Sequence, residues 1–281
     1  MQTLLNTPHE IIQQNILGAA AKAKTRILNI LVLGMMAGSF IAMGAQSSSL
    51  AVHNISNIGL ARTLAGCIFP VGLMMIVFVG GELFTGDCMM SMAWMQRKIH
   101  FADMLRTLVL VYVSNFVGAA LIAFLVAHSG QYDYSSGALG AYTIKVAYGK
   151  VHLSFANALV SGILCNILVC VAVLMAAAAK DIAGKVLAIF FPILAFVVSG
   201  FEHCVANMYY IPAGIFASKN AAYAAKAFEL YNIDSTQLSS LNWGSFAISN
   251  LIPVTIGNII GGALLVGGAC FYLHGKALHE S

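Results

Sequence analysis

Charged residues are scarce in this chain. Only 9% of the 281 residues are Asp, Glu, Lys or Arg, whereas 60% are hydrophobic, and the mean hydropathy is +0.86. A soluble globular domain carries about 25% charged residues. This shortage argues against a water-soluble protein and predicts one integral membrane domain with lipid around it. The net charge of +4 is dispersed, so there is no basic run to make nucleic acid a partner.

Patterns typical of enzymes and metal proteins are also missing. The six cysteines form no CxxC pair, and all but Cys88 lie well inside apolar stretches, so we interpret them as buried hydrophobic residues. The sequence shows no metal-ligand cluster, no nucleophile–base set and no cofactor fingerprint. Residues 1–26 lack the apolar core and cleavage site of a signal peptide. We therefore expect no enzymatic activity, no metal and no cofactor.

Long hydrophobic segments are abundant instead. A straight helical span needs about 20 residues, and six segments suffice, at 27–46, 63–96, 103–128, 153–179, 186–216 and 245–273. The second and fifth are interrupted, near 80–87 and 199–203, and we expect each to form two half-helices joined by an irregular loop. The prediction is an all-α membrane protein with an amphipathic helix at 1–26, a six-helix transmembrane domain at 27–275 and a C-terminal tail at 276–281.

The two halves of the chain are similar in sequence. The segment Asn115-Phe-Val-Gly-Ala-Ala-Leu-Ile122 matches Asn258-Ile-Ile-Gly-Gly-Ala-Leu-Leu265, which lies 143 positions later, and Gly81 aligns with Gly200, 119 positions later. Three spans followed by three similar spans must cross the membrane in opposite senses, because three is odd. We therefore predict an inverted 3+3 repeat, 27–128 and 153–273, in which a solute site lies at the midplane between broken helices.

The placement of Lys and Arg predicts the orientation. With six spans and both termini on one side, that side holds nine of these residues and the other side holds five. Cytoplasmic loops carry the excess of positive charge. We therefore expect both termini, including the helix at 1–26, to lie on the cytoplasmic side of the cytoplasmic (inner) membrane.

One ionisable residue lies in a stretch that otherwise has the composition of buried membrane helix. His203 follows Ser199-Gly200 and precedes Asn207. An ionisable group at bilayer depth is costly and usually faces a cavity or a transport path. Irregular backbone is tolerated at that depth only where protein or a water-lined cavity shelters it. These features predict a site for a small polar solute or ion, and the alternative is a hydrogen-bonded structural histidine.

Five motifs, in this order along nearly the whole chain, resemble those of the formate/nitrite transporter family. They are Gly81-Glu-Leu-Phe-Thr-Gly86, Lys150-Val-His152, Gly162-Ile-Leu-Cys-Asn-Ile-Leu-Val-Cys170, Ser199-Gly-Phe-Glu-His-Cys-Val-Ala-Asn-Met208 and Asn250-Leu-Ile-Pro-Val-Thr-Ile-Gly-Asn-Ile-Ile-Gly-Gly262. The resemblance implies a homopentamer of aquaporin-like protomers. Each protomer would carry its own pore for small monovalent anions of weak acids.

The resemblance also implies roles for single residues. The substrate pathway would contain His203, Thr85, Asn166 and Lys150. One hydrophobic constriction would be formed by Phe69, Leu73 and Phe196, and the other by Leu83, Phe84 and Val169. Glu202 and Asn207 would support the histidine. Gly86-Asp87 depart from the family pattern, in a stretch that varies among members with different preferred anions.

Several of these residues have structural interpretations as well. Thr85 could cap the second half-helix, Asn166 could cross-link helices through its amide, and Lys150 could be an interfacial residue whose charge reaches water. Asn115 and Asn258 are expected to stabilise helix packing. A dry constriction and a packed core use the same apolar residue types, so the sequence alone does not separate them.

The functional expectation is a channel or proton-coupled transporter for small weak-acid anions, with formate first and nitrite or hydrosulfide as alternatives. Moving a bare anion into hydrocarbon costs on the order of tens of kcal/mol, whereas the neutral acid loses much less. Histidine, with a reference pKa of about 6.5, suits brief protonation at the midplane. A neutral-solute pore of aquaporin type is a further alternative, although Ala206-Asn207-Met208 lacks the proline of that signature. The N-terminal helix could act as a gate.

Overall fold

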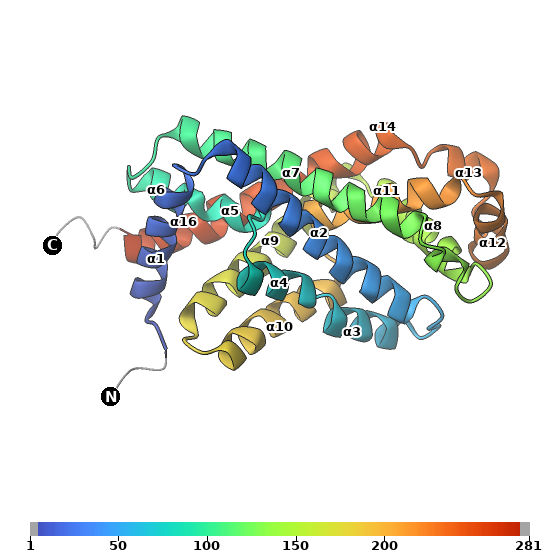
Figure 1. Cartoon of the computed structure of the whole chain (residues 1–281), viewed down its shortest axis with the longest axis horizontal. Coiled ribbons are helices and arrows are strands. Elements are labelled where there is room, and N and C mark those ends of the chain that lie inside the picture. Colours follow the sequence, from blue (N-terminus) through green and yellow to red (C-terminus); the bar gives the residue numbers. More distant parts are fainter. Residues whose placement is uncertain (1–4, 276–281) are drawn as a thin grey trace.

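The computed structural model describes residues 5–275, and nearly all of them are helical (Figure 1). Within this range no strand forms apart from an isolated bridge between Leu5 and Ala179. Six helical stretches are long and apolar enough to cross a membrane, namely α2 (Ile27–Val52), α3 with α4 (Ile58–Ile68 and Val71–Val79), α7 (Phe101–Ala127), α9 (Phe155–Ala178), α10 (Ile182–Ser199) and a last stretch over Trp243–Gly275. The all-α fold with six spans is therefore confirmed.

The second and fifth spans are broken, as predicted. After α4 the chain is extended through residues 80–83 and then continues as α5 (Phe84–Asp87), a 3-10 turn (Cys88–Met90) and α6 (Ser91–Met95). After α10 it is extended to His203 and continues as α11 (Cys204–Ser218). Gly80, with φ of 100°, and Gly200, with φ of 71°, end the first half-helices in conformations that glycine adopts without a steric penalty.

Two asparagines hold the breaks by equivalent hydrogen bonds. The amide oxygen of Asn115, on α7, accepts from the Phe84 N–H at 3.0 Å, and its nitrogen donates to the carbonyls of Gly34 and Glu82, both at 2.8 Å. Backbone groups freed at membrane depth need protein partners of this kind.

The second break repeats the arrangement. The amide oxygen of Asn258 accepts from the Cys204 N–H at 2.9 Å, and its nitrogen donates to the carbonyls of Gly162 at 2.7 Å and Glu202 at 3.1 Å. Each asparagine thus makes the same three bonds within its own repeat. It donates to a carbonyl of the first span and to the glutamate carbonyl in the break, and it accepts from the first N–H of the second half-helix. The inverted repeat therefore has a structural basis in addition to the similarity in sequence.

These bonds correct the predicted alignment by one residue. Glu82 corresponds to Glu202, and Gly80, rather than Gly81, corresponds to Gly200, which is 120 positions later. Two apolar segments can be aligned in sequence at several offsets with similar scores. The positive φ of Gly80 and of Gly200 identifies the equivalent positions.

The repeat also begins earlier than predicted. Helix α1 (Pro8–Lys22) precedes α2 as helix α8 (Ala138–Val151) precedes α9. Residues 1–4 of the predicted N-terminal segment and the predicted tail at 276–281 lie outside the described residues.

Two predicted boundaries are also wrong. The first span continues to Val52 instead of stopping at residue 46, because the polar residues at its end are paired inside the protein. Gln46 bonds to Gln131 and Tyr209, and the Ser48 hydroxyl donates to the Ala65 carbonyl at 3.2 Å. The segment between the predicted fifth and sixth spans, 217–244, lies outside every predicted helix but contains α12 (Ala221–Tyr231) and α13 (Ser235–Ser239).

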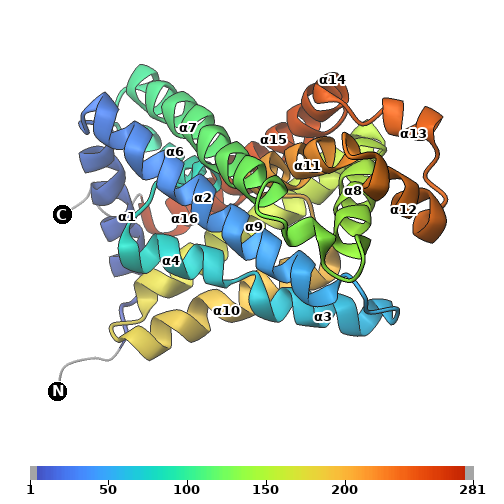
Figure 2. The same cartoon turned by 45° about the vertical axis from the view of Figure 1, so that its right-hand side comes forward.

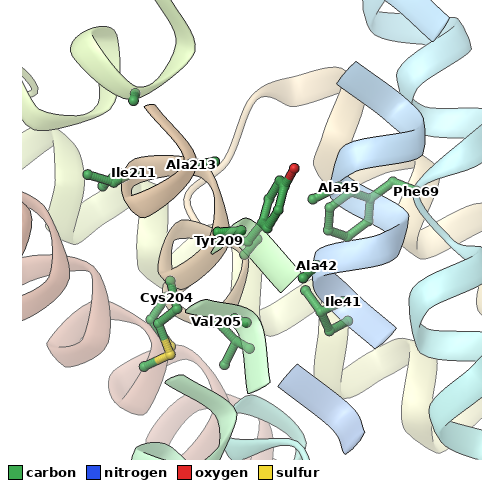
Figure 3. Close-up of a cluster of buried hydrophobic side chains, with 14 of the residues drawn as sticks. Ile41, Ala42, Ala45, Phe69, Cys204, Val205, Tyr209, Ile211 and Ala213 are labelled. Atoms are coloured by element: carbon green, nitrogen blue, oxygen red, sulfur yellow. The ribbon is translucent and has the colours of Figure 1, made fainter. Parts of the chain in front are cut away.

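The spans surround a central region where the two breaks meet. Helices α1 and α6, with α16 (Gly267–Cys270) from the last span, gather at one end of the molecule, and α8, α12 and α13 gather at the other (Figures 1 and 2). Figure 3 shows Tyr209 projecting from α11 toward Ala42 and Ala45 of α2. We call the two ends the α1 side and the α8 side.

Small residues bring α2 and α7 together. A methyl group added at Gly38 would lie 2.0 Å from the Asn115 carbonyl oxygen, and one added at Gly118 would lie 2.0 Å from that of Met35. Close approach through small residues is a usual way for membrane helices to pack. Here it also fixes Asn115, which holds the first break.

We expect Gly38→Ala to destabilise the protein by about 1–3 kcal/mol, because the added methyl meets rigid backbone. Gly149→Ala, on α8, is the matched control, since nothing lies within 4 Å of the added methyl there, and alanine favours a helix. Thermal unfolding of the purified protein in detergent measures the difference. Equal midpoints for the two variants would contradict this packing.

Candidate functional site

A cavity opens on each side of the broken helices. The α8-side cavity, of about 270 Å³, includes Lys150, His203, Asn207, Phe69 and Phe196 in its lining. The α1-side cavity, of about 730 Å³, includes Lys22, Glu82, Asp87, Leu73 and Leu83. The two linings share no residue. Two cavities that approach the broken helices from opposite sides are an arrangement suited to the passage of a small solute.

The imidazole of His203 lies at the base of the α8-side cavity and is only 3% exposed. Its Nδ1 accepts the Ala206 N–H at 3.1 Å, so it caps α11. An accepting Nδ1 carries no proton, and the neutral ring therefore carries its proton on Nε2. Nε2 lies 2.9 Å from the Thr85 hydroxyl oxygen and donates to it. The histidine thus joins the two half-helices, α11 through its cap and α5 through Thr85.

A polar network surrounds Lys150 at the end of α8. Its ammonium donates to Glu202 Oε1 at 2.8 Å and lies 5.2 Å from the centre of the Tyr210 ring. Glu202 Oε2 accepts from Asn207 Nδ2 at 2.6 Å and from Asn250 Nδ2 at 3.3 Å. Asn250 lies in a π-helical stretch (Phe246–Leu251) of the last span. The network anchors the predicted residues Lys150, Glu202 and Asn207 beside His203.

The α1-side cavity has a lysine in the equivalent place. Lys22, the last residue of α1, forms ion pairs with both Glu82 and Asp87. Burial alone would lower the pKa of Lys22, but the Asp87 and Glu82 carboxylates outweigh that effect and raise it above its usual value. The two ion pairs of Lys22 tie α1 to the first break.

The linings of the two cavities correspond through the repeat. Residues of the broken spans correspond at 120 positions, and residues of α1 and α8 at 128 positions. The pairs that line both cavities include Ile76 with Phe196, Gly80 with Gly200, Leu83 with His203, Asp87 with Asn207, and Lys22 with Lys150. The two cavities are thus matched in backbone, whereas several of their side chains differ.

Asn166 is fully buried, and its amide nitrogen is hydrogen-bonded to other groups of the protein. Its amide nitrogen donates to the carbonyls of Thr85 at 3.1 Å and Asn258 at 2.7 Å. It therefore cross-links α9 to α5 and to α15 (Ile252–Ile259), as one of the two sequence interpretations proposed. Its role as a solute contact remains a prediction.

The predicted constriction residues lie in four places. Phe69 and Phe196 line the α8-side cavity with ring centres 5.4 Å apart, and the Phe196 ring stacks on His203. Leu73 and Leu83 line the α1-side cavity, and Leu73 shares a buried cluster with the two phenylalanines. Phe84 packs against Tyr112 and lines a separate apolar cavity. Val169, on α9, is buried in the hydrophobic core.

Sequence reasoning missed the part that Lys22 and Asp87 play in the site. Lys22 lay within the predicted amphipathic helix at 1–26 and had no predicted role, and Asp87 was interpreted only as a departure from a motif. The available signal was the spacing, since Lys150 and Gly162 follow Lys22 and Gly34 by the same 128 positions.

Comparisons with known proteins agree with this architecture. A family model described as "Formate/nitrite transporter" matches residues 9–272. The "Probable formate transporter" of Methanothermobacter thermautotrophicus is 38% identical, with 90% of this chain and 91% of that protein covered. "Formate channel FocA" of Escherichia coli (strain K12) is 35% identical, with 88% and 86% covered. A solved "Pentameric formate channel with formate bound" is 31% identical with a TM-score of 0.77, covering 88% of this chain and 97% of that one.

The chain belongs to the formate/nitrite transporter family. Proteins of this family are membrane channels and transporters rather than enzymes, and the six apolar spans make this one a multi-pass membrane protein.

We expect Asn258→Ala to lower the stability of the protein strongly. The substitution leaves the Cys204 N–H and the carbonyls of Gly162 and Glu202 without their partner, and each buried orphan costs about 1–3 kcal/mol. Asn157→Ala, at an exposed position of α9, is the control and is expected to be neutral. Thermal unfolding in detergent compares them, and an unchanged midpoint for Asn258→Ala would show that the second break does not depend on this side chain.

Proposed function

We propose that this protein is a channel through which small monovalent anions of weak acids, formate first among them, cross the membrane. One observation carries the proposal. At the base of a cavity that holds a lysine, a buried His203 presents an N–H toward Thr85, between apolar side chains on both sides. Formate is chosen because named relatives are formate channels and a related structure is described with formate bound.

The steps follow from the cost of moving charge. Lys150 and its neighbours attract an anion into the α8-side cavity, where a unit charge at 4 Å contributes about 4 kcal/mol at an effective dielectric constant of 20. The phenylalanine rings then exclude water, which strengthens hydrogen bonds to the solute. Next, Thr85 and His203 exchange their mutual bond for bonds to the carboxylate or the acid. Because Nδ1 caps α11, His203 assists by donating from Nε2, and a doubly protonated ring would have to break that cap.

The assembly and orientation belong to the same proposal. We propose a homopentamer, by analogy with the related structure described as pentameric, in which each protomer has its own passage. Both termini lie in the cytoplasm, so the α1 side faces the cytoplasm and the α8 side faces outward. Protons accompany the anion, and lipid surrounds the outer helices.

We expect proteoliposomes containing the protein to take up formate faster than empty liposomes. Nitrite and hydrosulfide compete in the same assay across a pH series, and the order of the three rates identifies the preferred anion. Stopped-flow water permeability serves as the control for an aquaporin-type pore. Formate permeability no greater than that of empty liposomes would refute the formate assignment.

The paired hydroxyl and imidazole give a sharper prediction. Thr85→Val keeps the volume but removes the partner of His203 Nε2, and we expect formate flux to fall by roughly tenfold or more, as the loss of a buried hydrogen bond worth about 1.4 kcal/mol implies. Thr85→Ser keeps the hydroxyl and is expected to retain most of the flux. His203→Asn, whose amide can still cap α11, is expected to lower the flux, because the shorter side chain holds its N–H nearer the backbone than Nε2. Equal flux in Thr85→Val and Thr85→Ser would exclude a role for the hydroxyl.

A further inference from the structure

The two cavities match in backbone but differ in charge. On the α8 side, Lys150 and Arg62 line the cavity, and Glu202 is bound to Lys150. On the α1 side, Lys22 faces two carboxylates, Glu82 and Asp87. With every group ionised, the first set carries one net positive charge and the second carries one net negative charge. An anion therefore meets attraction on one side and repulsion on the other.

Asp87 is a principal source of this difference. Its repeat counterpart is the neutral Asn207, which hydrogen-bonds to Glu202 as a donor. Asp87 is 4% exposed and accepts from Lys22 through Oδ1, whereas Oδ2 is buried with no hydrogen-bond partner. A buried carboxylate oxygen without a donor is costly. A proton on one of the two carboxyl groups would remove the excess negative charge of the set.

Among the described residues that line this cavity, Lys22 is the one cation. Among the residues that line this cavity, Lys22, Glu82 and Asp87 are the charged ones. The remaining titratable groups near Asp87 are the buried thiols of Cys88, on the following turn, and Cys170, on α9. The apolar α4 and α9 residues Leu73, Ile76 and Val173 complete this part of the wall. The charge balance therefore depends on the two carboxyl groups.

We propose that Glu82 and Asp87, together with Lys22, form a proton-binding site on the α1 side, and that Asp87 makes this side differ from the α8 side. With the proton bound, the cavity is neutral and accepts an anion. Without it, the cavity repels anions. This inference rests on the proposed function. It predicts that at neutral pH anion uptake is faster from the α8 side than from the α1 side, and that this difference in rate becomes smaller as the α1 side is acidified.

The proton site is tested without transport. Infrared difference spectra of the purified protein, recorded over a pH series from about 8 to about 6, should show the C=O band of a protonated carboxyl group, because unperturbed Asp and Glu remain ionised over that range. The band should be lost in Asp87→Asn, which keeps the Lys22–Glu82 pair. Asp103→Asn, a charge removal elsewhere on the α1 side, should retain it. Identical spectra for the wild-type protein and Asp87→Asn would overturn the proposal.

The directional consequence is tested by flux. Formate uptake is measured in proteoliposomes of sorted orientation, from each side in turn, with the pH set separately on the two sides. Asp87→Asn should raise uptake from the α1 side by roughly tenfold at neutral pH and remove its dependence on α1-side pH, as expected for one charge in a confined cavity. Asn207→Asp takes the α8-side set from one net positive charge to neutral and should lower uptake from that side. Size-exclusion chromatography verifies that the variants assemble like the wild-type protein.

The outcomes separate this inference from the proposed function. If the wild-type protein carries no formate, the proposed function fails, while the infrared spectra still decide whether the proton site exists. If the wild-type protein carries formate and Asp87→Asn leaves both directions and their pH dependence unchanged, the inference fails and the proposed function stands. If Asp87→Asn makes formate uptake from the two sides equal and Asp103→Asn does not, the inference and the proposed function are both supported.

Discussion

The structure depends on pairing the backbone groups that two broken helices release inside a membrane. Lipid offers no partner for a free N–H or carbonyl, so each break needs a side chain with both a donor and an acceptor. Asn115 and Asn258 meet this need with the same three bonds. Asn166 then links the two sets, because it donates to the carbonyls of Thr85 and Asn258. A rigid amide framework therefore fixes where the second half-helices begin and, with them, Leu83 and His203.

On this symmetric framework, the two repeats differ in a few side chains. The residue that caps α11 is His203, whereas its counterpart before α5 is Leu83, so only one break carries an imidazole. Asn207 and Asp87 differ in the same way, by one charge. Because the backbone geometry is matched, these substitutions alter chemistry with little change in shape. A passage built this way can treat its two ends differently without a separate gate.

Much of this architecture could be predicted because it depends on the composition of short stretches of sequence. Six apolar segments, two glycine-marked interruptions and a lone buried histidine each leave a signal within a few residues, and the fold and the breaks followed from them. The Lys22–Asp87 pair left no such signal, because it joins residues 65 positions apart and appears only when α1 folds against the first break. The end of α2 was misplaced for a related reason. Gln46 and Ser48 look like the start of a loop until their buried partners are known.

The cap formed by His203 constrains how a proton can move through the proposed channel. Nδ1 is committed to the Ala206 N–H, and the ring can offer only its Nε2 proton toward Thr85. Releasing that proton outright would leave a buried imidazolate, and accepting a second one would break the cap of α11. Both states cost more than a hydrogen bond donated to a passing solute. The ring is therefore better suited to sharing a proton than to carrying one, and a proton that travels with the anion is more readily supplied and collected at the two ends of the passage.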